Sequence, residues 1–158
     1  MFNGSYDVAQ ICGNGHVVTS SLEDFPETGR KFCEKCGAPT LSECRNCSAR
    51  IRGACRGVFS LSYDRPEFCG ECGAPFPWTQ TAIDEWHALT EMMENLSAEE
   101  RKRLDSVIDD LVRDTPGTNR ATLMLKSLAP KLGKEGWDAM KGVLVSVATA
   151  AAKQQLGI

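Results

Sequence analysis

Apolar side chains in the second half of the chain recur at helical spacing. Between residues 79 and 158 they return every three or four positions, with charged and polar residues in between. This period places the apolar side chains of each segment along one face of an α-helix. It predicts about four amphipathic helices, which suit a small helical bundle. The predicted helices cover residues 79–96, 97–114, 118–132 and 135–156.

Local signals mark where these helices begin and end. Ser97-Ala-Glu-Glu100 is a capping box, in which the serine and glutamate side chains bond free amides of the first turn. Thr115-Pro-Gly117 stops the second helix, and Gly133 stops the third. Pro130 is expected to bend or shorten that third helix.

The last predicted helix is nearly free of charge from Val143 to Ala152. Its small side chains favour a place in the core or in an oligomer contact. A helix at a membrane interface is the alternative, but such a helix carries a basic polar face that this segment lacks. No run of about eighteen apolar residues occurs, so the sequence predicts no membrane-spanning segment.

The first half has short apolar runs separated by turn residues. The runs His16–Ser20 and Gly57–Tyr63 predict β-strands, the second because its apolar residues alternate with period two. We expect a small α+β protein that joins two tandem β-rich ribbons, the cysteine-containing part of the chain, to an all-α region. The expected boundaries are residues 1–78 for the ribbons, divided into about 8–40 and 41–78, and 79–158 for the helices.

All eight cysteines lie in the first half, and six of them form pairs separated by two residues. The start of the chain lacks the basic and apolar regions of a secretory signal, so a reducing, cytoplasmic location is expected. There, closely spaced cysteines indicate metal ligands rather than disulfides. A two-residue gap lets one tight turn present both thiolates to the same ion. The pairs are Cys33/Cys36, Cys44/Cys47 and Cys69/Cys72.

A fourth pair combines a cysteine with a histidine. In Cys12-Gly-Asn-Gly-His16, two glycines let the loop fold back so that both side chains reach one ion. The alternative interpretation of His16 is an ordinary surface histidine. That alternative leaves one site short of a ligand, whereas structural zinc takes four.

An internal repeat indicates how the four pairs combine. The segment 32–39, Phe-Cys-Glu-Lys-Cys-Gly-Ala-Pro, is echoed at 68–75 by Phe-Cys-Gly-Glu-Cys-Gly-Ala-Pro. In both, glycine follows the second cysteine, at Gly37 and Gly73, where a turn with positive φ favours it. Two structural zinc sites are expected: site 1 from Cys12, His16, Cys33 and Cys36, and site 2 from Cys44, Cys47, Cys69 and Cys72.

Two alternatives concern this arrangement. In a cross-brace, as in the RING domains of ubiquitin ligases, the first and third pairs would share an ion. The tandem repeat argues against it, because duplication copies whole units. Iron could replace zinc in a four-thiolate site such as site 2, whereas the histidine of site 1 favours zinc. In either case four protein ligands leave no open position for a catalytic water.

Cys55 and four arginines lie outside these sites. Cys55 is interpreted as an incidental loop residue, although neighbouring arginines would lower the pKa of a reactive thiol. The stretch from Cys44 to Tyr63 has no acidic residue. Its arginines could form a contact surface for phosphates or for an acidic protein. We favour the alternative, in which they offset the negative charge of a four-thiolate zinc site. These arginines are Arg45, Arg50, Arg52 and Arg56.

Several short motifs, spread over most of the chain, carry a family resemblance. They are residues 12–18 (Cys-Gly-Asn-Gly-His-Val-Val), 31–40, 51–53 (Ile-Arg-Gly), 76–79 (Phe-Pro-Trp-Thr) and 114–116 (Asp-Thr-Pro). Together they resemble an uncharacterised bacterial family, a domain of unknown function with two zinc-ribbon-like units and a helical tail. The resemblance supports the same eight ligands, leaves Cys55 outside the pattern and implies no activity.

These features favour a non-catalytic protein. No phosphate-binding glycine loop, nucleophile elbow or paired His-Glu helix motif occurs. The formal net charge of −3 gives no general electrostatic reason to bind nucleic acid. We expect an adaptor or scaffold for a protein partner, with two structural zinc ions. The alternatives are a nucleic-acid-binding accessory protein that uses Arg45–Arg56, and a RING-like ligase or an iron electron carrier; the oligomeric state stays open.

Overall fold

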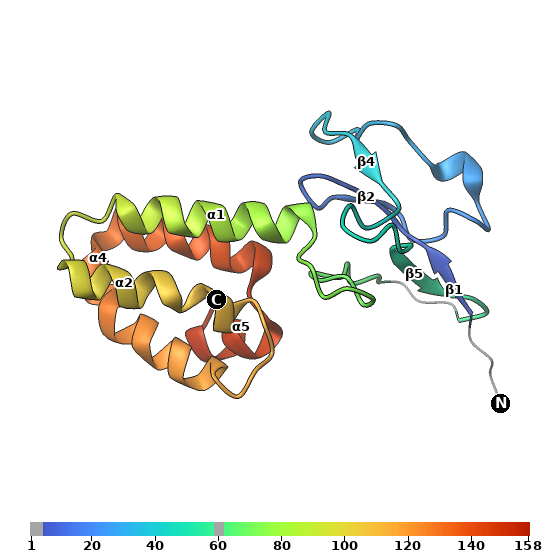
Figure 1. Ribbon diagram of the computed structural model, residues 1–158. Helices are drawn as coiled ribbons and strands as arrows, with labels where there is room; N and C mark the ends of the chain where they lie inside the picture. Colours follow the sequence, from blue (N-terminus) through green and yellow to red (C-terminus); the bar gives the residue numbers. More distant parts are fainter. Residues whose placement is uncertain (1–4, 59–61) are drawn as a thin grey trace. The chain divides into compact units, whose positions relative to one another are not determined.

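The computed structural model describes residues 5–58 and 62–158 (Figure 1). The chain divides into two compact units, Met1–Gln80 and Thr81–Ile158. We call them the ribbon unit and the helical unit. The architecture is small α+β, with short antiparallel strands in the first half and helices in the second.

Two small antiparallel sheets form the framework of the ribbon unit. One has two strands in the order β1-β5, and the other has three in the order β3-β2-β4. A single turn of 3-10 helix, Pro26–Thr28, follows β3. The strands are β1 Tyr6–Val8, β2 Gln10–Cys12, β3 Val17–Thr19, β4 Thr40–Leu41 and β5 Arg52–Cys55.

The two ribbon segments share one core. Strand β1, at the start of the first segment, pairs with β5 of the second. Ile11 and Ile51 are almost fully buried in a cluster that also contains Phe76 and Trp78. The rings of Phe76 and Trp78 stack with centroids 4.8 Å apart. Because apolar residues from both segments fill this small core, neither segment buries its own apolar surface alone.

Of the two predicted strands, one is confirmed. The prediction for His16–Ser20 is confirmed by β3. The predicted strand Gly57–Tyr63 lies in part outside the described residues, because it includes 59–61, and its described ends are not in a strand. The nearest strand is β5, just before it, whose pattern of burial does not alternate cleanly. Short strands of this kind leave too few residues for a periodic signal.

Several helices begin or end at the predicted signals, although the first, predicted over 79–96, ends at Glu91. Ser97 accepts a hydrogen bond from the Glu100 amide, and the Glu100 side chain accepts one from the Ser97 amide, so the capping box is confirmed. Gly133 adopts φ 70° and ψ 172° and interrupts the helical backbone, as its role as a stop predicts. The helices are α1 Pro77–Glu91, α2 Ala98–Ser106, α3 Ile108–Leu111, α4 Thr118–Val147 and α5 Ala150–Leu156.

Two predicted helices are broken where continuity was expected. The second divides at Val107 into α2 and α3. The last ends at Val147, and Thr149 starts α5 by accepting a hydrogen bond from the Ala152 amide. A threonine side chain at this position satisfies a free amide of a new helix, and so it competes with continuation of the old one. The continuous helix 135–156 was therefore a wrong prediction.

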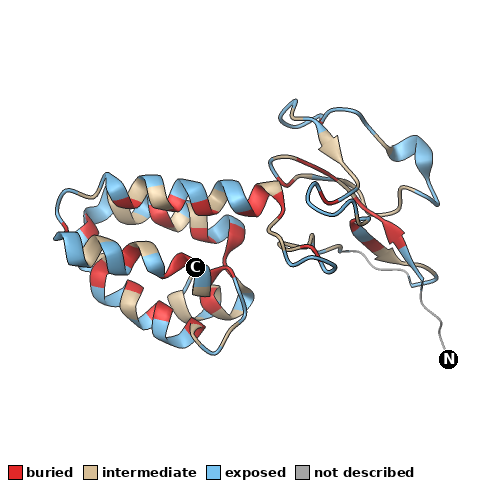
Figure 2. Ribbon diagram, in the orientation of Figure 1, coloured by how far each residue is buried: buried red, intermediate tan, exposed pale blue. Residues whose placement is uncertain are grey.

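Burial follows the apolar stripes along the helices (Figure 2). The stripe from Leu104 to Val112 and the leucines at 125, 128 and 132 are buried as the helical period predicts. In the uncharged segment, Leu144, Val147 and Ala152 are buried, so this segment contributes to the core. Among the helices of the described residues, none combines the length and the apolar character needed to cross a membrane.

The backbone at Gly133 gives a test of this fold. A side chain would be strained at its positive φ, although no heavy atom lies within 4 Å of the added Cβ. We expect Gly133→Ala to lower the free energy of unfolding by about 1–2 kcal/mol. The control is Gly142→Ala, also free of neighbours, where regular helix predicts a gain of up to about 1 kcal/mol. Urea unfolding followed by circular dichroism measures both, and equal stabilities would contradict the strain at Gly133.

Candidate metal centres

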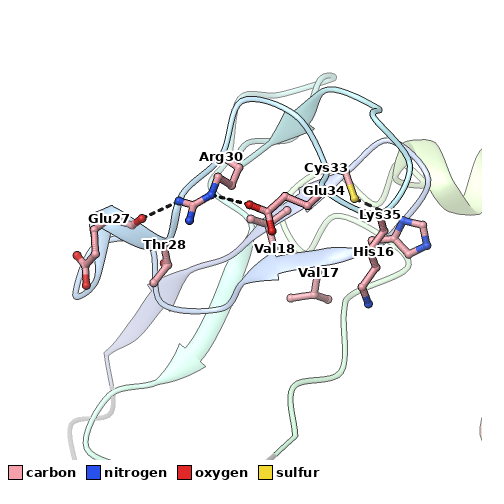
Figure 3. A pocket seen from close by; sticks show the side chains of 9 residues that line it. All are labelled: His16, Val17, Val18, Glu27, Thr28, Arg30, Cys33, Glu34 and Lys35. Atoms are coloured by element: carbon pink, nitrogen blue, oxygen red, sulfur yellow. Dashed lines mark hydrogen bonds and ion pairs between the residues drawn. The ribbon is translucent and has the colours of Figure 1, made fainter.

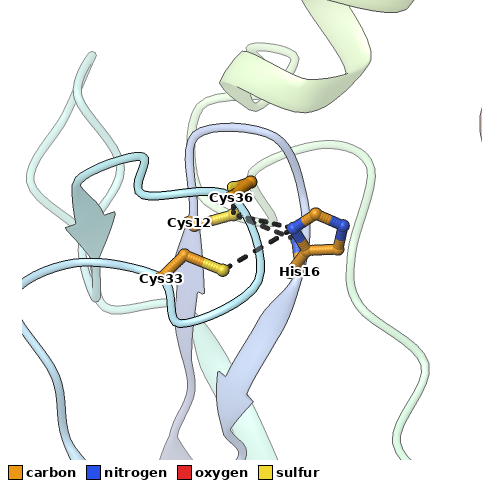
Figure 4. A group of neighbouring side chains, drawn as sticks. All are labelled: Cys12, His16, Cys33 and Cys36. Carbon is orange, nitrogen blue, oxygen red and sulfur yellow. Dashed lines mark hydrogen bonds between the residues drawn. The ribbon is translucent and has the colours of Figure 1, made fainter.

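The structure gathers the predicted ligands into two groups. In each group, the candidate ligand atoms all lie within 4.8 Å of one another, so each group could hold a metal ion. The groups join pairs in sequence order, the first with the second and the third with the fourth, rather than in a cross-brace. Site 1 contains Cys12, His16, Cys33 and Cys36 (Figure 4), and site 2 contains Cys44, Cys47, Cys69 and Cys72.

The three cysteine pairs are built as the same backbone knuckle. In each, the amide of the first cysteine donates to the carbonyl of the alanine five residues later, at 2.8 Å in all three. The amide after the second cysteine donates back to the first cysteine's carbonyl. An isolated antiparallel bridge closes each knuckle, at Phe32–Pro39, Glu43–Arg50 and Phe68–Pro75. The knuckle of Cys44 is thus a third copy of the repeat, although its sequence retains only the cysteines and Ala49.

The residue after the second cysteine needs a left-handed backbone in all three knuckles. Gly37 and Gly73 both have φ 71°, which confirms the expectation of positive φ there. Ser48 occupies the same place in the remaining knuckle with φ 61°. A non-glycine residue in this region carries a conformational cost. The stability of the Cys44/Cys47 knuckle therefore depends more strongly on the contacts around it than that of the other two.

Site 1 opens with a different loop. The Cys12 amide donates to the His16 carbonyl at 3.0 Å, and the Gly15 amide donates to the Cys12 carbonyl at 2.8 Å. This tight loop turns the His16 ring inward, so that its Nδ1 atom lies 3.6 Å from Sγ of both Cys12 and Cys33 (Figure 4). His16 is thus part of the group and not an isolated surface histidine.

The distances between ligand atoms fit a small tetrahedral ion. With zinc bonds of about 2.3 Å to sulfur and about 2.05 Å to nitrogen, tetrahedral geometry separates two sulfurs by about 3.8 Å and a sulfur and nitrogen by about 3.6 Å. Cys12 and Cys36 sulfurs lie 3.8 Å apart in site 1. In site 2 the Cys44–Cys72 and Cys47–Cys69 sulfur distances are 3.8 Å and 3.6 Å.

The thiols in each group differ in how easily they ionise. Hydrogen bonds from the Ala38 amide and the Asn14 side chain lower the pKa of the Cys36 thiol to about 6. Hydrogen bonds from the Asn46 side chain and the Ala74 amide lower the pKa of Cys72 to about 6 as well. Burial, in contrast, raises the pKa of Cys12. A metal ion that binds here must displace protons from the remaining thiols, so its affinity falls as the pH falls.

In each site, an asparagine near the first cysteine donates a hydrogen bond to the last cysteine. The Asn14 side-chain amide donates to Cys36 Sγ at 3.4 Å, and the Asn46 amide donates to Cys72 Sγ at 3.4 Å. Each asparagine stands two residues after the first cysteine of its site. Sequence reasoning missed these residues, although their common position relative to the first cysteine is a visible signal. Such donors orient a thiolate and lower its charge density.

Arg65 links the loop of site 1 to the segment that closes site 2. Its guanidinium donates to the Gly15 carbonyl at 2.7 Å and lies 5.8 Å from the Trp78 ring centroid. Its Nε also pairs with Glu67 at 3.2 Å. Trp78 is held in turn by a hydrogen bond from its Nε1 to the Pro66 carbonyl at 3.0 Å. The geometry of the Cys12–His16 loop therefore depends on residues fifty positions later.

The arginine segment does not form a free basic patch. Arg50 and Arg56 both pair with Glu23, and the Arg56 guanidinium also lies 3.7 Å from the buried carboxylate of Asp7. Arg52 lies over the Tyr6 ring at 3.4 Å. Arg45 is exposed. The expected compensation of a four-thiolate site is not found for Arg50 and Arg56. Their partners are carboxylates, Glu23 for both and also Asp7 for Arg56, and not the thiols of site 2.

Cys55 belongs to neither group. It is partly exposed, and its Sγ lies 3.8 Å from the Arg56 carbonyl oxygen. Its thiol is therefore next to backbone and not next to another ligand atom of the two sites. This placement agrees with its interpretation as a residue outside the metal centres, although Cys55 ends strand β5 and does not lie in a loop as expected.

An open hollow of about 480 Å³ lies beside site 1 (Figure 3). Two ligands, His16 and Cys33, form part of its wall. Val17 and Val18 of β3 supply apolar surface, and β3 is an edge strand of its sheet. The opposite side is formed by charged residues, with Arg30 held by Glu34 at 3.0 Å and by the Glu27 carbonyl at 2.7 Å.

The chain as a whole matches a known family. A family described as "Uncharacterized protein conserved in bacteria (DUF2321)" matches residues 5–156. The chain therefore belongs to this family, and the resemblance inferred from its short motifs is confirmed. No curated protein and no solved structure matches the chain.

The two asparagines provide a test of the sites. We expect Asn14→Ala to weaken metal binding at site 1, and Asn46→Ala to weaken it at site 2, each by about 10- to 100-fold, because a thiolate loses its donor. Competition with a chromogenic chelator measures both affinities. Each variant serves as the control for the other site, and exposed Asn95→Ala controls for both. An unchanged affinity at the variant's own site would contradict the role of the asparagine.

Proposed function

We propose that this member of the bacterial family binds two structural zinc ions and acts as a non-catalytic adaptor for a protein partner. Zinc is supported by the ligand set of site 1, in which three thiolates and an imidazole suit this ion. The spacing of the ligand atoms in both sites also agrees with zinc bond lengths. Cysteines that remain reduced suit the cytoplasm of a bacterium.

A structural role for the ions is supported by the size of the ribbon unit's elements. Its strands contain only two to four residues. Buried Cys44 and Cys69 belong to its apolar cluster, so the core and site 2 are made in part of the same residues. A unit with so little regular structure gains most from a metal, which contributes on the order of 10 kcal/mol at neutral pH.

A non-catalytic role is supported by the number of ligands. Each group supplies four side chains, which complete a tetrahedral shell. A catalytic zinc keeps a position for water or substrate. His16 and Cys33 line the neighbouring hollow, but both belong to the ligand set of site 1, so a bound metal would leave neither free to act as base or nucleophile.

The hollow beside site 1 is the observation that carries the adaptor proposal. Its wall includes two ligands, so a metal at site 1 would fix its shape. Exposed apolar side chains stand on the same unit, with Val17 36% and Phe32 61% exposed. Apolar side chains surrounded by polar ones are typical of protein contact surfaces. Zinc would thus organise a surface and take no part in chemistry.

Nucleic-acid binding is the weaker candidate. The two arginines that pair with carboxylates would have to leave those partners to contact phosphates. No other local excess of positive charge supports it in the ribbon unit. Filter binding with single- and double-stranded DNA and RNA tests it, and a steep salt dependence would support it.

Metal analysis of purified protein tests the zinc assignment. We expect two zinc ions per chain and no iron colour. Cys47→Ser is expected to lose one ion, because it removes a ligand of site 2. Cys55→Ser, a matched change at a cysteine outside both groups, is expected to retain two. Loss of an ion from Cys55→Ser would show that the ligand assignment is wrong.

Capture of a partner from the native host tests the adaptor role. We expect a tagged protein to retain a specific partner that is released by a chelator or by Val17→Glu, because both change the wall of the hollow. Val145→Glu alters a side chain of similar exposure in the helical unit and is expected to retain the partner. Retention by the chelated protein would place the interaction outside the ribbon unit and contradict the proposal.

A further inference from the structure

A second surface lies on the helical unit, which contains none of the ligands of the metal centres. The bend of α4 at Gly133 opens a mainly apolar groove of about 410 Å³. Trp137 and Leu156 are partly buried there, while Pro130 is exposed. Leu123, 68% exposed, lies on the same helical face as Pro130, seven residues earlier, and extends the apolar surface. The groove is lined by Lys126, Ala129, Pro130, Gly133, Lys134, Trp137 and Leu156.

The groove is flanked by positive charge. Lys126 and Lys134 line it, and no acidic residue does. Nearby Lys131 pairs with Glu100. Within the described part of the chain, no carboxylate pairs with Lys126 or Lys134. This local excess belongs to a wider asymmetry: residues 118–158 contain six basic and two acidic residues, whereas residues 84–114 contain four basic and ten acidic ones.

A complementary feature occurs on the acidic side of the same unit. Met92, in the turn between α1 and α2, is 74% exposed. Glu91 and Glu94 flank it, are exposed, and have no ion-pair partner among the described residues. Met92 does not line the groove of its own chain. Methionine is unbranched and adapts readily to an irregular apolar pocket.

We propose that the groove binds the Met92 turn of a second copy of this chain. Met92 would enter the apolar floor near Trp137, and the two glutamates would face Lys126 and Lys134. Opposite charges on two otherwise unpaired surfaces favour this occupant over a neutral one. The association lies on the helical unit, so it goes beyond the proposed function of the ribbon unit and does not depend on it.

The position of the two features allows a closed dimer. Met93, next to Met92, lies against Gly136, 3.1 Å from the position of an added Cβ, so the turn adjoins the segment after the bend. Figure 1 shows the turn after α1 and the bend of α4 at the same end of the helical unit. Two copies can therefore exchange turns around a two-fold axis, each supplying one turn and one groove.

Charge reversal in the zinc-loaded full-length protein tests the proposal. Analytical ultracentrifugation is expected to show dimers that weaken with added salt. Lys126→Glu/Lys134→Glu and Glu91→Lys/Glu94→Lys are each expected to raise the dissociation constant at least about tenfold, because like charges then meet. An equimolar mixture of the two variants is expected to dimerise again, since each groove then meets a turn of opposite charge.

Controls separate this outcome from misfolding and from other ligands. Lys31→Glu/Lys102→Glu makes the same change in net charge at exposed lysines outside the groove and is expected to dimerise normally. Circular dichroism confirms that each variant is folded. A monomeric wild-type protein, dimers that survive both reversals, or folded variants whose mixture stays monomeric would overturn the proposal. So would a monomer that binds phosphatidylglycerol vesicles through the two lysines, because the groove would then be a lipid surface.

Discussion

Each candidate metal centre of the ribbon unit requires four ligand atoms from two separate segments of the chain to come within bonding range of one ion. Thiolates less than 4 Å apart would repel one another unless a cation lay between them, so metal binding would be coupled to the folding of this unit. The knuckle hydrogen bonds fix each pair locally. These hydrogen bonds do not bring the two halves of a site together. The short strands help to do so, but they are too small to hold the halves in place alone.

The two sites are connected through the rest of the ribbon unit. Strand β1 pairs with β5, apolar residues of both segments share one core, and Arg65 holds the loop of site 1 to the segment around Trp78. The repeat visible in the sequence thus supplies the closing knuckle of each site within one connected unit, and the hollow beside site 1 is formed on that framework.

The helical unit is organised by an apolar core and by an uneven distribution of charge. Its apolar stripes build an ordinary core, with Leu104, Leu125 and Leu144 fully buried. Its charges are divided along the chain, acidic before Thr118 and basic after it. Within the unit, some acidic and basic side chains form ion pairs, as Lys131 does with Glu100. Among the charges with no ion-pair partner in the described residues are Glu91 and Glu94 beside Met92, and Lys126 and Lys134 along the Gly133 groove, which is why both features point to association.

The sequence by itself determined the class of the fold, the eight ligands that come together, and those helix ends that carry a local signal. These depend on local chemistry: the spacing of cysteines, a repeated knuckle, a capping box and a glycine with positive φ at 133. It overestimated the length of the last helix, because the competing cap at Thr149 is a single-residue signal within a long apolar pattern.

Only the tertiary structure decided the pairing of β1 with β5, the neutralisation of Arg50 and Arg56 by distant carboxylates, and the support that Asn14 and Asn46 give to the last cysteine of each site. Each joins residues more than fifteen positions apart. Such contacts follow from how the chain closes on itself, and strands of two to four residues carry too little pattern to reveal their partners in advance.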